Sequence, residues 1–280
     1  MFGLIAYSIN DPAGRGTVQK LRDLLLCRET ALKIPQAIEV YDCERYPIMI
    51  AGFKDDVLYF DFLEFTNANF ILIVSRHSAK SAIPTLTTHT PGNPSGNAFA
   101  GGKPWELPPS NPILQWFILK NEIKYRNEFQ LNTFEVTYEV THHGPTSLSK
   151  PVTFAEIGST IDEWNNDTAQ KALAYAIQHS LHSYFHLNNS KPCIISIGFG
   201  GPHYAPTFTK RALKNNECYG HIISSYILKE LDIAELEKIV KLTILKTPQV
   251  ERIVIEKLRS DIRKVIEKCA KEFKIEIVKA

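Results

Sequence analysis

The sequence predicts an α/β fold with a mostly parallel or mixed sheet. Short runs rich in β-branched residues alternate along the chain with longer segments whose apolar residues recur at helical spacing. The chain has 280 residues and 44% of them are hydrophobic, which is enough for one large α/β core. No internal repeat and no linker composition is visible, so we expect a single domain over residues 1–280.

Strands are expected where β-branched and aromatic residues form short runs between turn residues. The run FILIVS is apolar throughout, which is typical of a central strand covered on both faces. The run TFEVTYEV alternates in polarity and leads directly into two histidines. The predicted strands are residues 4–9, 37–42, 56–63, 70–75, 133–140, 151–158, 192–201 and 273–278.

Helices are expected where apolar residues recur every three or four positions. Thr17 is a plausible N-cap for the first of them, and Ser159 and Glu163 lie near capping-box spacing before the third. The predicted helices are residues 16–27, 113–129 and 168–187, a short helix around Lys210, and several helices between 225 and 271.

Residues 87–112 form a predicted long loop crowded with Gly, Pro and Asn. Loops of this length inside a compact domain are more often functional or mobile than merely connective. We therefore expect this segment to contribute to a site.

Charge and cysteine content exclude few classes of protein. Lys plus Arg number 32 against 30 Asp plus Glu, and the net charge of +2 neither supports nor excludes nucleic-acid binding. The five cysteines show no CxxC spacing, so we expect reduced, mostly buried thiols. No basic leader and no apolar run of about 20 residues is visible, so we expect a cytoplasmic protein without membrane association.

Polar residues gather where the predicted strands end, and in open α/β sheets ligands bind outside the carboxyl ends of strands. Fingerprints of dinucleotide, P-loop and serine-hydrolase sites are missing from the sequence. The nine histidines divide into a helical trio (His179, His182, His186), which we interpret as a satisfied helix face, and six at strand ends or in loops, namely His77, His89, His142, His143, His203 and His221.

The adjacent pair His142 and His143 cannot face the same way in an extended strand, because successive side chains point to opposite faces. Either the strand has ended by His142, or one ring enters a site and the other packs or supports it. Glu156 is the carboxylate that we expect nearest to them. It would complete a mixed His/Glu metal site or orient a histidine as general base, and the residues alone leave both alternatives open.

Six motifs carry a resemblance to a known family. They are SRHSAKS, LTTHTPGN, GGKPWELP, EVTHHGPT, AEIGST followed by DEW, and GGPHYAPTFT, and they span about residues 74–223. Together they resemble the archaeal and plant type of D-aminoacyl-tRNA deacylase. The resemblance implies a three-layer α/β/α sandwich of the phosphorylase/hydrolase-like kind, similar to peptidyl-tRNA hydrolase.

The resemblance also implies an activity, a cofactor and a partner. Members hydrolyse the ester between a D-amino acid and the tRNA 3′ end, which recycles mischarged tRNA and protects against D-amino acid toxicity. They are described as zinc-dependent monomers. Ester hydrolysis needs an activated water, a stabilised oxyanion and a grip on the substrate.

We assign candidate residues on this basis. The catalytic and metal-binding candidates are His89, His142, Glu156 and His203. The substrate-binding candidates are Arg76, His77, Lys80, Thr88, Thr141, His143, Ser159, Gly200, Gly201 and Tyr204. Basic residues near the predicted mouth, among them Lys120, Lys124, Lys210, Arg211 and Lys214, are expected to contact tRNA phosphates.

Two alternatives stay open at this point. One is a peptidyl-tRNA hydrolase-like or nucleoside-processing enzyme on the same architecture. The other is a non-catalytic tRNA-binding module, for which the clustered histidines would be excessive.

Overall fold

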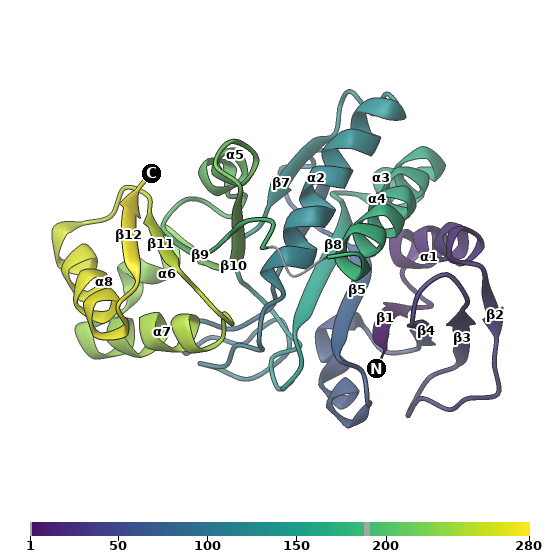
Figure 1. Ribbon diagram of the computed structural model, residues 1–280, viewed down its shortest axis with the longest axis horizontal. Coiled ribbons are helices and arrows are strands. Elements are labelled where there is room, and N and C mark those ends of the chain that lie inside the picture. Colours follow the sequence, from purple (N-terminus) through teal and green to yellow (C-terminus); the bar gives the residue numbers. More distant parts are fainter. Residues whose placement is uncertain (1, 188–190) are drawn as a thin grey trace.

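The computed structural model describes residues 2–187 and 191–280 of the chain (Figure 1). Within this part, the strands form two sheets that lie side by side. The larger, eight-stranded sheet has the order β2-β3-β4-β1-β5-β8-β6-β7 and the smaller, four-stranded sheet the order β10-β9-β11-β12. The mixed α/β class is confirmed, whereas the second sheet was not anticipated.

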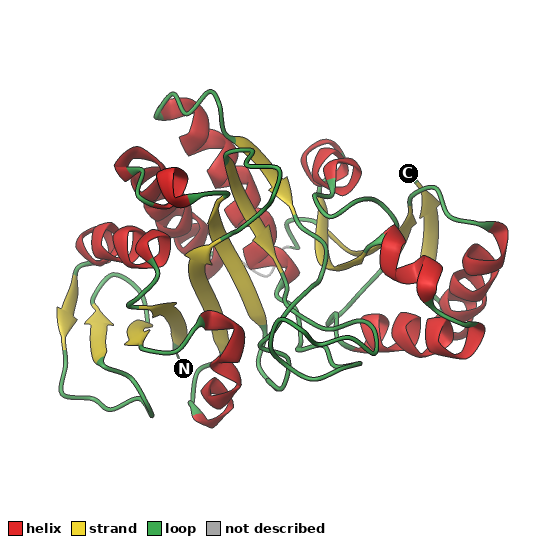
Figure 2. Cartoon of the chain, turned by 180° about the vertical axis from the view of Figure 1, so that it is seen from behind, coloured by secondary structure: helices red, strands yellow, loops and turns green. Residues whose placement is uncertain are grey.

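The strands have the following bounds: β1 Gly3–Ser8, β2 Cys27–Glu29, β3 Glu39–Cys43, β4 Ile48–Phe53, β5 Phe70–Arg76, β6 Thr85–His89, β7 Glu135–Tyr138, β8 Val152–Gly158, β9 Ile194–Phe199, β10 Glu217–Ile223, β11 Arg252–Ile255 and β12 Glu276–Lys279. The helices are α1 Pro12–Leu25, the 3₁₀ helix η1 Val57–Phe65, α2 Pro112–Glu128, α3 Ile161–Trp164, α4 Asp167–Phe185, α5 Pro206–Lys214, α6 Ser225–Glu230, α7 Ile233–Leu245 and α8 Ser260–Phe273. Figure 2 shows the same elements from behind.

The larger sheet is mixed. Strands β4, β1, β5 and β8 run parallel to one another, whereas β6 is antiparallel to β8 and parallel to β7. One face packs against α1, α2 and α4, and the other face packs against η1. The carboxyl ends of β5 and β8 therefore reach the same edge of the sheet, between layers that bury both faces.

The two sheets are joined by the chain that follows β7. Backbone N–H groups of Val140 and Thr141 donate to the carbonyl oxygens of His203 and Ile222, at 3.0 and 2.7 Å. The N–H of Ala205 donates in turn to the carbonyl of Tyr138 at 2.9 Å. The histidine-bearing segment 139–143 thus leaves the larger sheet and pairs with the chain around the smaller one.

One predicted strand is wrong. Residues 57–65 form the 3₁₀ helix η1, whose first turn is capped by Asp56 accepting from the N–H of Leu58. Its buried residues Val57, Phe60 and Leu63 recur at a spacing of three, which fits a helix and not the alternation of a strand.

Further boundaries need correction. Helix α1 begins at Pro12, where Asp11 caps it, so Thr17 lies inside the helix and is not its N-cap. The predicted loop 87–112 begins three residues later, because β6 extends to His89 between β8 and β7. The predicted all-helical segment 225–271 is interrupted by β11, whose short apolar run pairs with β9 and β12.

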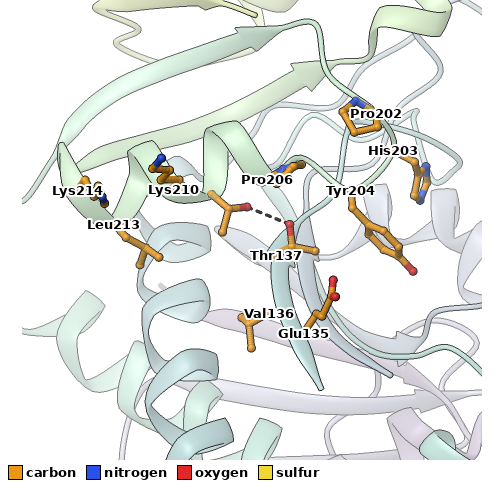
Figure 3. Close-up of a pocket in the computed structure, with 11 residues that line it drawn as sticks. Glu135, Val136, Thr137, Pro202, His203, Tyr204, Pro206, Lys210, Leu213 and Lys214 are labelled. Atoms are coloured by element: carbon orange, nitrogen blue, oxygen red, sulfur yellow. Dashed lines mark hydrogen bonds between the residues drawn. The ribbon is translucent and has the colours of Figure 1, made fainter. Parts of the chain in front are cut away.

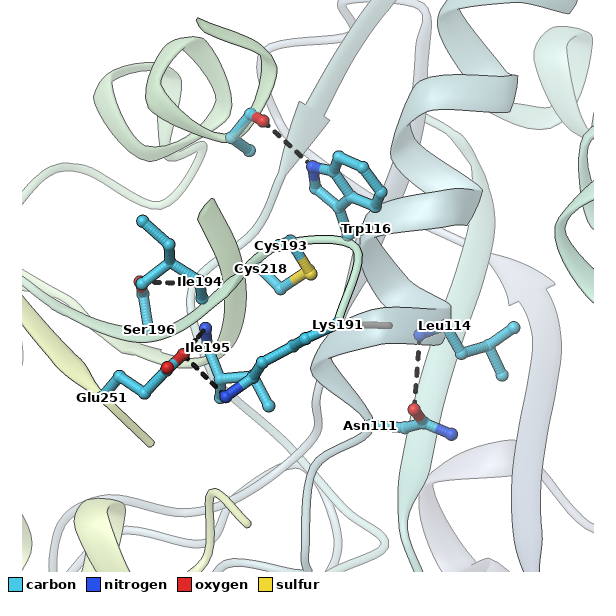
Figure 4. Close-up of a disulfide and its surroundings, with 11 residues drawn as sticks. Asn111, Leu114, Trp116, Lys191, Cys193, Ile194, Ile195, Ser196, Cys218 and Glu251 are labelled. Atoms are coloured by element: carbon cyan, nitrogen blue, oxygen red, sulfur yellow. Dashed lines mark hydrogen bonds and ion pairs between the residues drawn. A yellow bond between two sulfur atoms is a disulfide. The ribbon is translucent and has the colours of Figure 1, made fainter. Parts of the chain in front are cut away.

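The expectation of reduced thiols is also wrong for four of the five cysteines. Cys27 and Cys43 lie opposite each other on β2 and β3 and form a disulfide. Cys193, just before β9, forms a second disulfide with Cys218 on the neighbouring strand β10 (Figure 4). Cys269 is free and buried. Spacing along the sequence did not reveal these pairs, because strand pairing brings their sulfur atoms together.

Candidate active site

The candidate site is a cavity of about 400 Å³ at the edge of the larger sheet where β5 and β8 end. The segment after β7 and the loop after β9 close its other side. The side chains of most interest among those that line it are Asp56, Arg76, His77, His142, His143, Glu156 and His203.

Glu139 lies at the centre of the site and is almost completely buried. Its Oε2 accepts from Nε2 of His203 at 2.9 Å, and its Oε1 lies 3.2 Å from Nδ1 of His77. Burial alone would raise the pKa of the Glu139 carboxyl, but the hydrogen bond from His203 and the histidines around it hold that pKa well below its usual range. Glu139 is therefore a carboxylate at neutral pH.

A second carboxylate, Glu156, lies beside the first. Its Oε1 accepts from the hydroxyl of Ser75 at 2.6 Å, and its Oε2 lies 3.3 Å from Nε2 of His89. Burial lowers the pKa of His89, yet the adjacent Glu156 carboxylate outweighs this effect and the net pKa is raised. The pKa of Glu156 is correspondingly lowered, with His89 opposing the effect of burial.

His142 and His143 complete the cluster from the segment after β7. Nδ1 of His142 lies 2.8 Å from the carbonyl of Val140 and must donate to it, which leaves Nε2 as the lone-pair nitrogen of the neutral ring. Burial together with the neighbouring histidines lowers the pKa of His142 well below its usual value and that of His143 to about 4. Both rings are neutral at physiological pH and present lone pairs.

The rings lie close enough to form one continuous cluster. The centroid of His142 is 4.2 Å from that of His143, 4.5 Å from that of His89 and 4.6 Å from that of His203. This resolves the question of the adjacent pair: the strand ends at Tyr138, so both rings reach the same region.

Several sets of side chains in the cluster place ligand atoms within 4.8 Å of one another, as a metal ion requires. These are His77, Glu139, His142 and His203; His89, His142 and His143; and His89, Glu139 and Glu156. Both ring nitrogens of His89, Oε1 of Glu139 and Oε2 of Glu156 are buried and have no hydrogen-bond partner among the described residues. Imidazole and carboxylate groups are ligands that zinc accepts.

The structure brings all four catalytic and metal candidates, His89, His142, Glu156 and His203, into this cluster, together with His77 and His143. Arg76 lines the cavity and pairs with Asp56 at 3.1 Å. Tyr204 lies beside the cluster, with its hydroxyl 3.1 Å from Nε2 of His77.

Other predicted substrate-binding groups have structural partners. The hydroxyls of Thr88 and Ser159 donate to the carbonyls of Phe154 and Ile83, at 2.7 and 2.6 Å. Thr141 bonds to His221 at 3.0 Å. Lys80 is exposed in the turn after β5 and does not line the cavity.

The glycines after β9 serve close packing. The N–H of Gly200 already donates to the carbonyl of Ile223 at 2.8 Å, so it is not free to hold an oxyanion. Gly200 has φ +118°, and a Cβ there would lie 2.1 Å from the carbonyl oxygen of Glu256. The same crowding affects Gly201, where a Cβ would lie 2.7 Å from the Glu256 carboxylate.

Sequence reasoning missed Glu139, the residue with the most contacts to the cluster. Glu139 opens the motif EVTHHGPT, but the run TFEVTYEV holds a second acid, Glu135, so the sequence did not single Glu139 out. His221 is instead a structural group, since its Nε2 donates to the carbonyl of Pro108 at 3.0 Å in a fully buried environment. The helical trio is satisfied as expected: His179 and His182 bond to the hydroxyls of Tyr125 and Tyr46.

Among the described residues, no helix combines the length and the apolar character that a membrane crossing requires.

Comparison with known proteins gives one consistent result. The family model described as D-aminoacyl-tRNA deacylase matches residues 64–278. The chain is 37% identical over 281 residues to the D-aminoacyl-tRNA deacylase of Desulfurococcus amylolyticus, and the match covers 99% of each protein. It is 36% identical to the protein of the same name from Aeropyrum pernix, with 96% of each covered. A crystal structure of a conserved protein of unknown function superposes with a TM-score of 0.86 at 29% identity, covering 99% of this chain and 95% of that one.

Proposed function

We propose that this chain, which belongs to the D-aminoacyl-tRNA deacylase family, hydrolyses the ester bond of D-aminoacyl-tRNA and releases tRNA and a free D-amino acid. The observation that carries the proposal is the buried cluster of histidines around Glu139 and Glu156 at the wall of a cavity. A peptidyl-tRNA hydrolase-like activity, a nucleoside-processing activity and a purely binding role have no comparable support from relatives.

His203 is the general base or acid in this proposal. With 36% of its side chain accessible, it is more exposed than His77, His89 and His142, and Glu139 accepts its Nε2–H at 2.9 Å. A carboxylate in that position orients the ring and stabilises the imidazolium that forms when His203 takes a proton from water. The other ring nitrogen, Nδ1, lies 3.5 Å from the hydroxyl of Tyr226, and the substrate water would take the place of this hydroxyl.

Zinc is the proposed cofactor, and the cluster fits it. Neutral His142 directs its Nε2 lone pair towards a carboxylate oxygen of Glu139, 3.5 Å away, and the unpartnered atoms of His89 and Glu156 lie beside them. A cation between such atoms offsets the repulsion between two acceptors that face each other with no proton between them. We propose His89, His142 and Glu156 as ligand candidates, with Glu139 and His77 added to them. His203, the remaining candidate, would bind the metal only in place of its acid/base role, because its Nε2–H is donated to Glu139.

Zinc at this position would polarise the ester carbonyl and lower the pKa of a bound water. The protein supplies the remaining chemistry. Glu156 lines the cavity and His89 lies buried behind it, where electrostatic interactions are stronger than in water. Arg76 at the mouth is available for a substrate phosphate once its exposed pair with Asp56 opens.

The biological role follows from the reaction. Removal of D-amino acids from tRNA recycles mischarged tRNA and protects translation from D-amino acids, and we propose this role for a cytoplasmic enzyme. We also propose that the chain acts as a monomer, as the family resemblance implies.

The proposal is tested by incubating the protein with D-Tyr-tRNA and L-Tyr-tRNA side by side. Hydrolysis of the D-ester alone supports the deacylase assignment. Hydrolysis of peptidyl-tRNA or of a nucleoside, with the D-ester left intact, would replace it with one of the alternatives.

A further inference from the structure

A second hollow of about 530 Å³ adjoins the active-site cavity (Figure 3). It lies between α5 and β7, and His203 and Tyr204 line it from the loop that also faces the active site. His203 lines both hollows and therefore lies between them.

The floor of this groove is apolar and its rim is basic. Val136, Pro206 and Leu213 form the floor, and Leu213 is 41% exposed although it is a large apolar side chain. Lys210 and Lys214 are exposed one helical turn apart on α5 (Figure 3). Apolar surface beside regularly spaced cations suits a single-stranded nucleic acid, whose bases stack or pack while its phosphates meet the cations.

Other charged residues near the groove add to its positive charge or reduce it. Lys120 on α2 lies over the ring of Trp116 at 4.1 Å, and the indole N–H of Trp116 donates to α5 at Ala212, which brings Lys120 to the same side. Arg211 is excluded from ligand binding, because Glu217 holds its guanidinium through two bonds of 2.7 and 2.8 Å. Glu135, at one end of β7, is the acid that lines the groove.

On the opposite side of the active site, Arg76 and Lys150 are held in ion pairs. Arg76 lies 3.1 Å from Asp56, with which it lines the cavity, and Lys150 lies 3.5 Å from Glu64. A phosphate backbone on that side would have to displace these ion pairs. The groove side therefore suits the polynucleotide better, and the histidine-lined cavity is left for the aminoacyl group.

We propose that the groove between α5 and β7 binds the single-stranded 3′ end of the tRNA, with its phosphates along Lys210 and Lys214 and its terminal nucleoside at Tyr204. The aminoacyl group then enters the histidine-lined cavity past His203. This inference rests on the proposed function, because the proposed function supplies the substrate class. The inference adds the orientation in which the substrate lies in the site.

The first test measures binding without catalysis. A fluorescein-labelled RNA hairpin that ends in single-stranded ACCA is titrated with the wild type and with the double variant Lys210→Ala/Lys214→Ala. The matched control is Lys264→Ala/Lys271→Ala, which removes two exposed lysines of α8. All three proteins are compared at several salt concentrations, and thermal melting confirms that each is folded.

The groove variant is expected to bind roughly tenfold more weakly. The slope of log K against log salt should fall by about 1.4, at about 0.7 for each phosphate contact of a single strand. Its kcat/KM for D-Tyr-tRNA should fall because KM rises. Its hydrolysis of D-tyrosine methyl ester, which has no nucleotide, should stay at the wild-type rate. Unchanged hairpin binding, or an equal loss in the α8 control, would overturn the assignment.

A crosslinking experiment tests the location directly. The same hairpin with a 3′-terminal 8-azidoadenosine should label peptides within residues 202–214 or 135–138. Labelling confined to residues 56–65 or 96–103 would place the 3′ end on the η1 side of the active site and refute the proposal. Both binding experiments use RNA that carries no amino acid, so they test the groove even if the wild type fails to hydrolyse D-Tyr-tRNA. Such a failure would contradict the proposed function alone.

Discussion

His142 and Glu139 face each other with two acceptor atoms, Nε2 and Oε2, 3.5 Å apart. The proton of the neutral His142 ring is on Nδ1, where it bonds to the carbonyl of Val140. Neither atom of the facing pair carries a proton to share, since the pKa of His142 and that of Glu139 are both held well below their usual values. Two buried lone pairs at this distance repel unless a cation lies near them.

The first prediction concerns the missed carboxylate. Glu139→Gln should lower the hydrolysis of D-Tyr-tRNA by roughly 10²- to 10⁴-fold, because the neutral amide neither stabilises the His203 imidazolium nor attracts a cation. The measurement is kcat/KM with melting temperature as a check of folding. Activity within threefold of the wild type would remove Glu139 from the mechanism.

Glu122 provides a matched control on α2. It is fully buried and, among the described residues, both of its carboxyl oxygens lack partners. Burial, assisted by the charges of Glu139 and Glu156, raises its pKa well above the usual range. Glu122 is therefore protonated, and Glu122→Gln should leave kcat/KM within about twofold of the wild type.

The same substitution should change stability in a pH-dependent manner. Between the normal carboxyl pKa and the raised one, the folded state holds a proton on Glu122 that the unfolded state has released, so Glu122 makes folding less favourable as pH rises. Glu122→Gln removes this pH-dependent loss of folding stability. Denaturant unfolding at pH 5 and pH 8 should show a gain in the free energy of unfolding that is larger at pH 8, and a gain that is larger at pH 5 would contradict a protonated Glu122.

His221 has the opposite dependence. Burial lowers its pKa to about 3, so below the unfolded value of about 6.5 the unfolded state binds a proton that the folded state does not. The contribution of neutral His221 to the free energy of unfolding is complete above pH 6.5. It is lost as pH falls, by up to about 1.4 kcal/mol per pH unit. Replacement of His221 by Gln should flatten the fall in stability between pH 6.5 and pH 5. An identical slope in the variant would show that His221 does not titrate on unfolding.

Metal binding should release a proton. Burial lowers the pKa of His89, but the adjacent Glu156 carboxylate outweighs burial and raises it above its usual value, which favours the protonated ring. A metal ion bound by His89 displaces this proton, since metals bind neutral imidazole. Calorimetric zinc titration at pH 7 in two buffers of different ionisation enthalpy should give heats that differ accordingly. Heats that do not depend on the buffer would mean that His89 is neutral or is not displaced.

The sequence predicted the parts of this structure that depend on local pattern. The apolar run of β5 and the β-branched run of β8 are strands in the structure, and the motifs at their ends meet as strand-end geometry requires. The 3₁₀ helix η1 was misassigned, because Val57, Phe60 and Leu63 belong to a run apolar enough to pass for a strand. Glu139 was overlooked because its importance depends on the crossing of segment 139–143 from one sheet to the other, which no local pattern encodes.

The most direct measurement of the central claim is the rate of D-Tyr-tRNA and L-Tyr-tRNA hydrolysis by metal-stripped protein as zinc is restored stepwise. We predict that only the D-ester is cleaved, that its rate rises with zinc until the cluster is filled, and that Glu139→Gln does not respond. An undiminished rate in stripped protein would contradict a metal role for the cluster and leave His203 with Glu139 as the acid/base pair. Failure to cleave the D-ester at any zinc concentration would contradict the deacylase function itself.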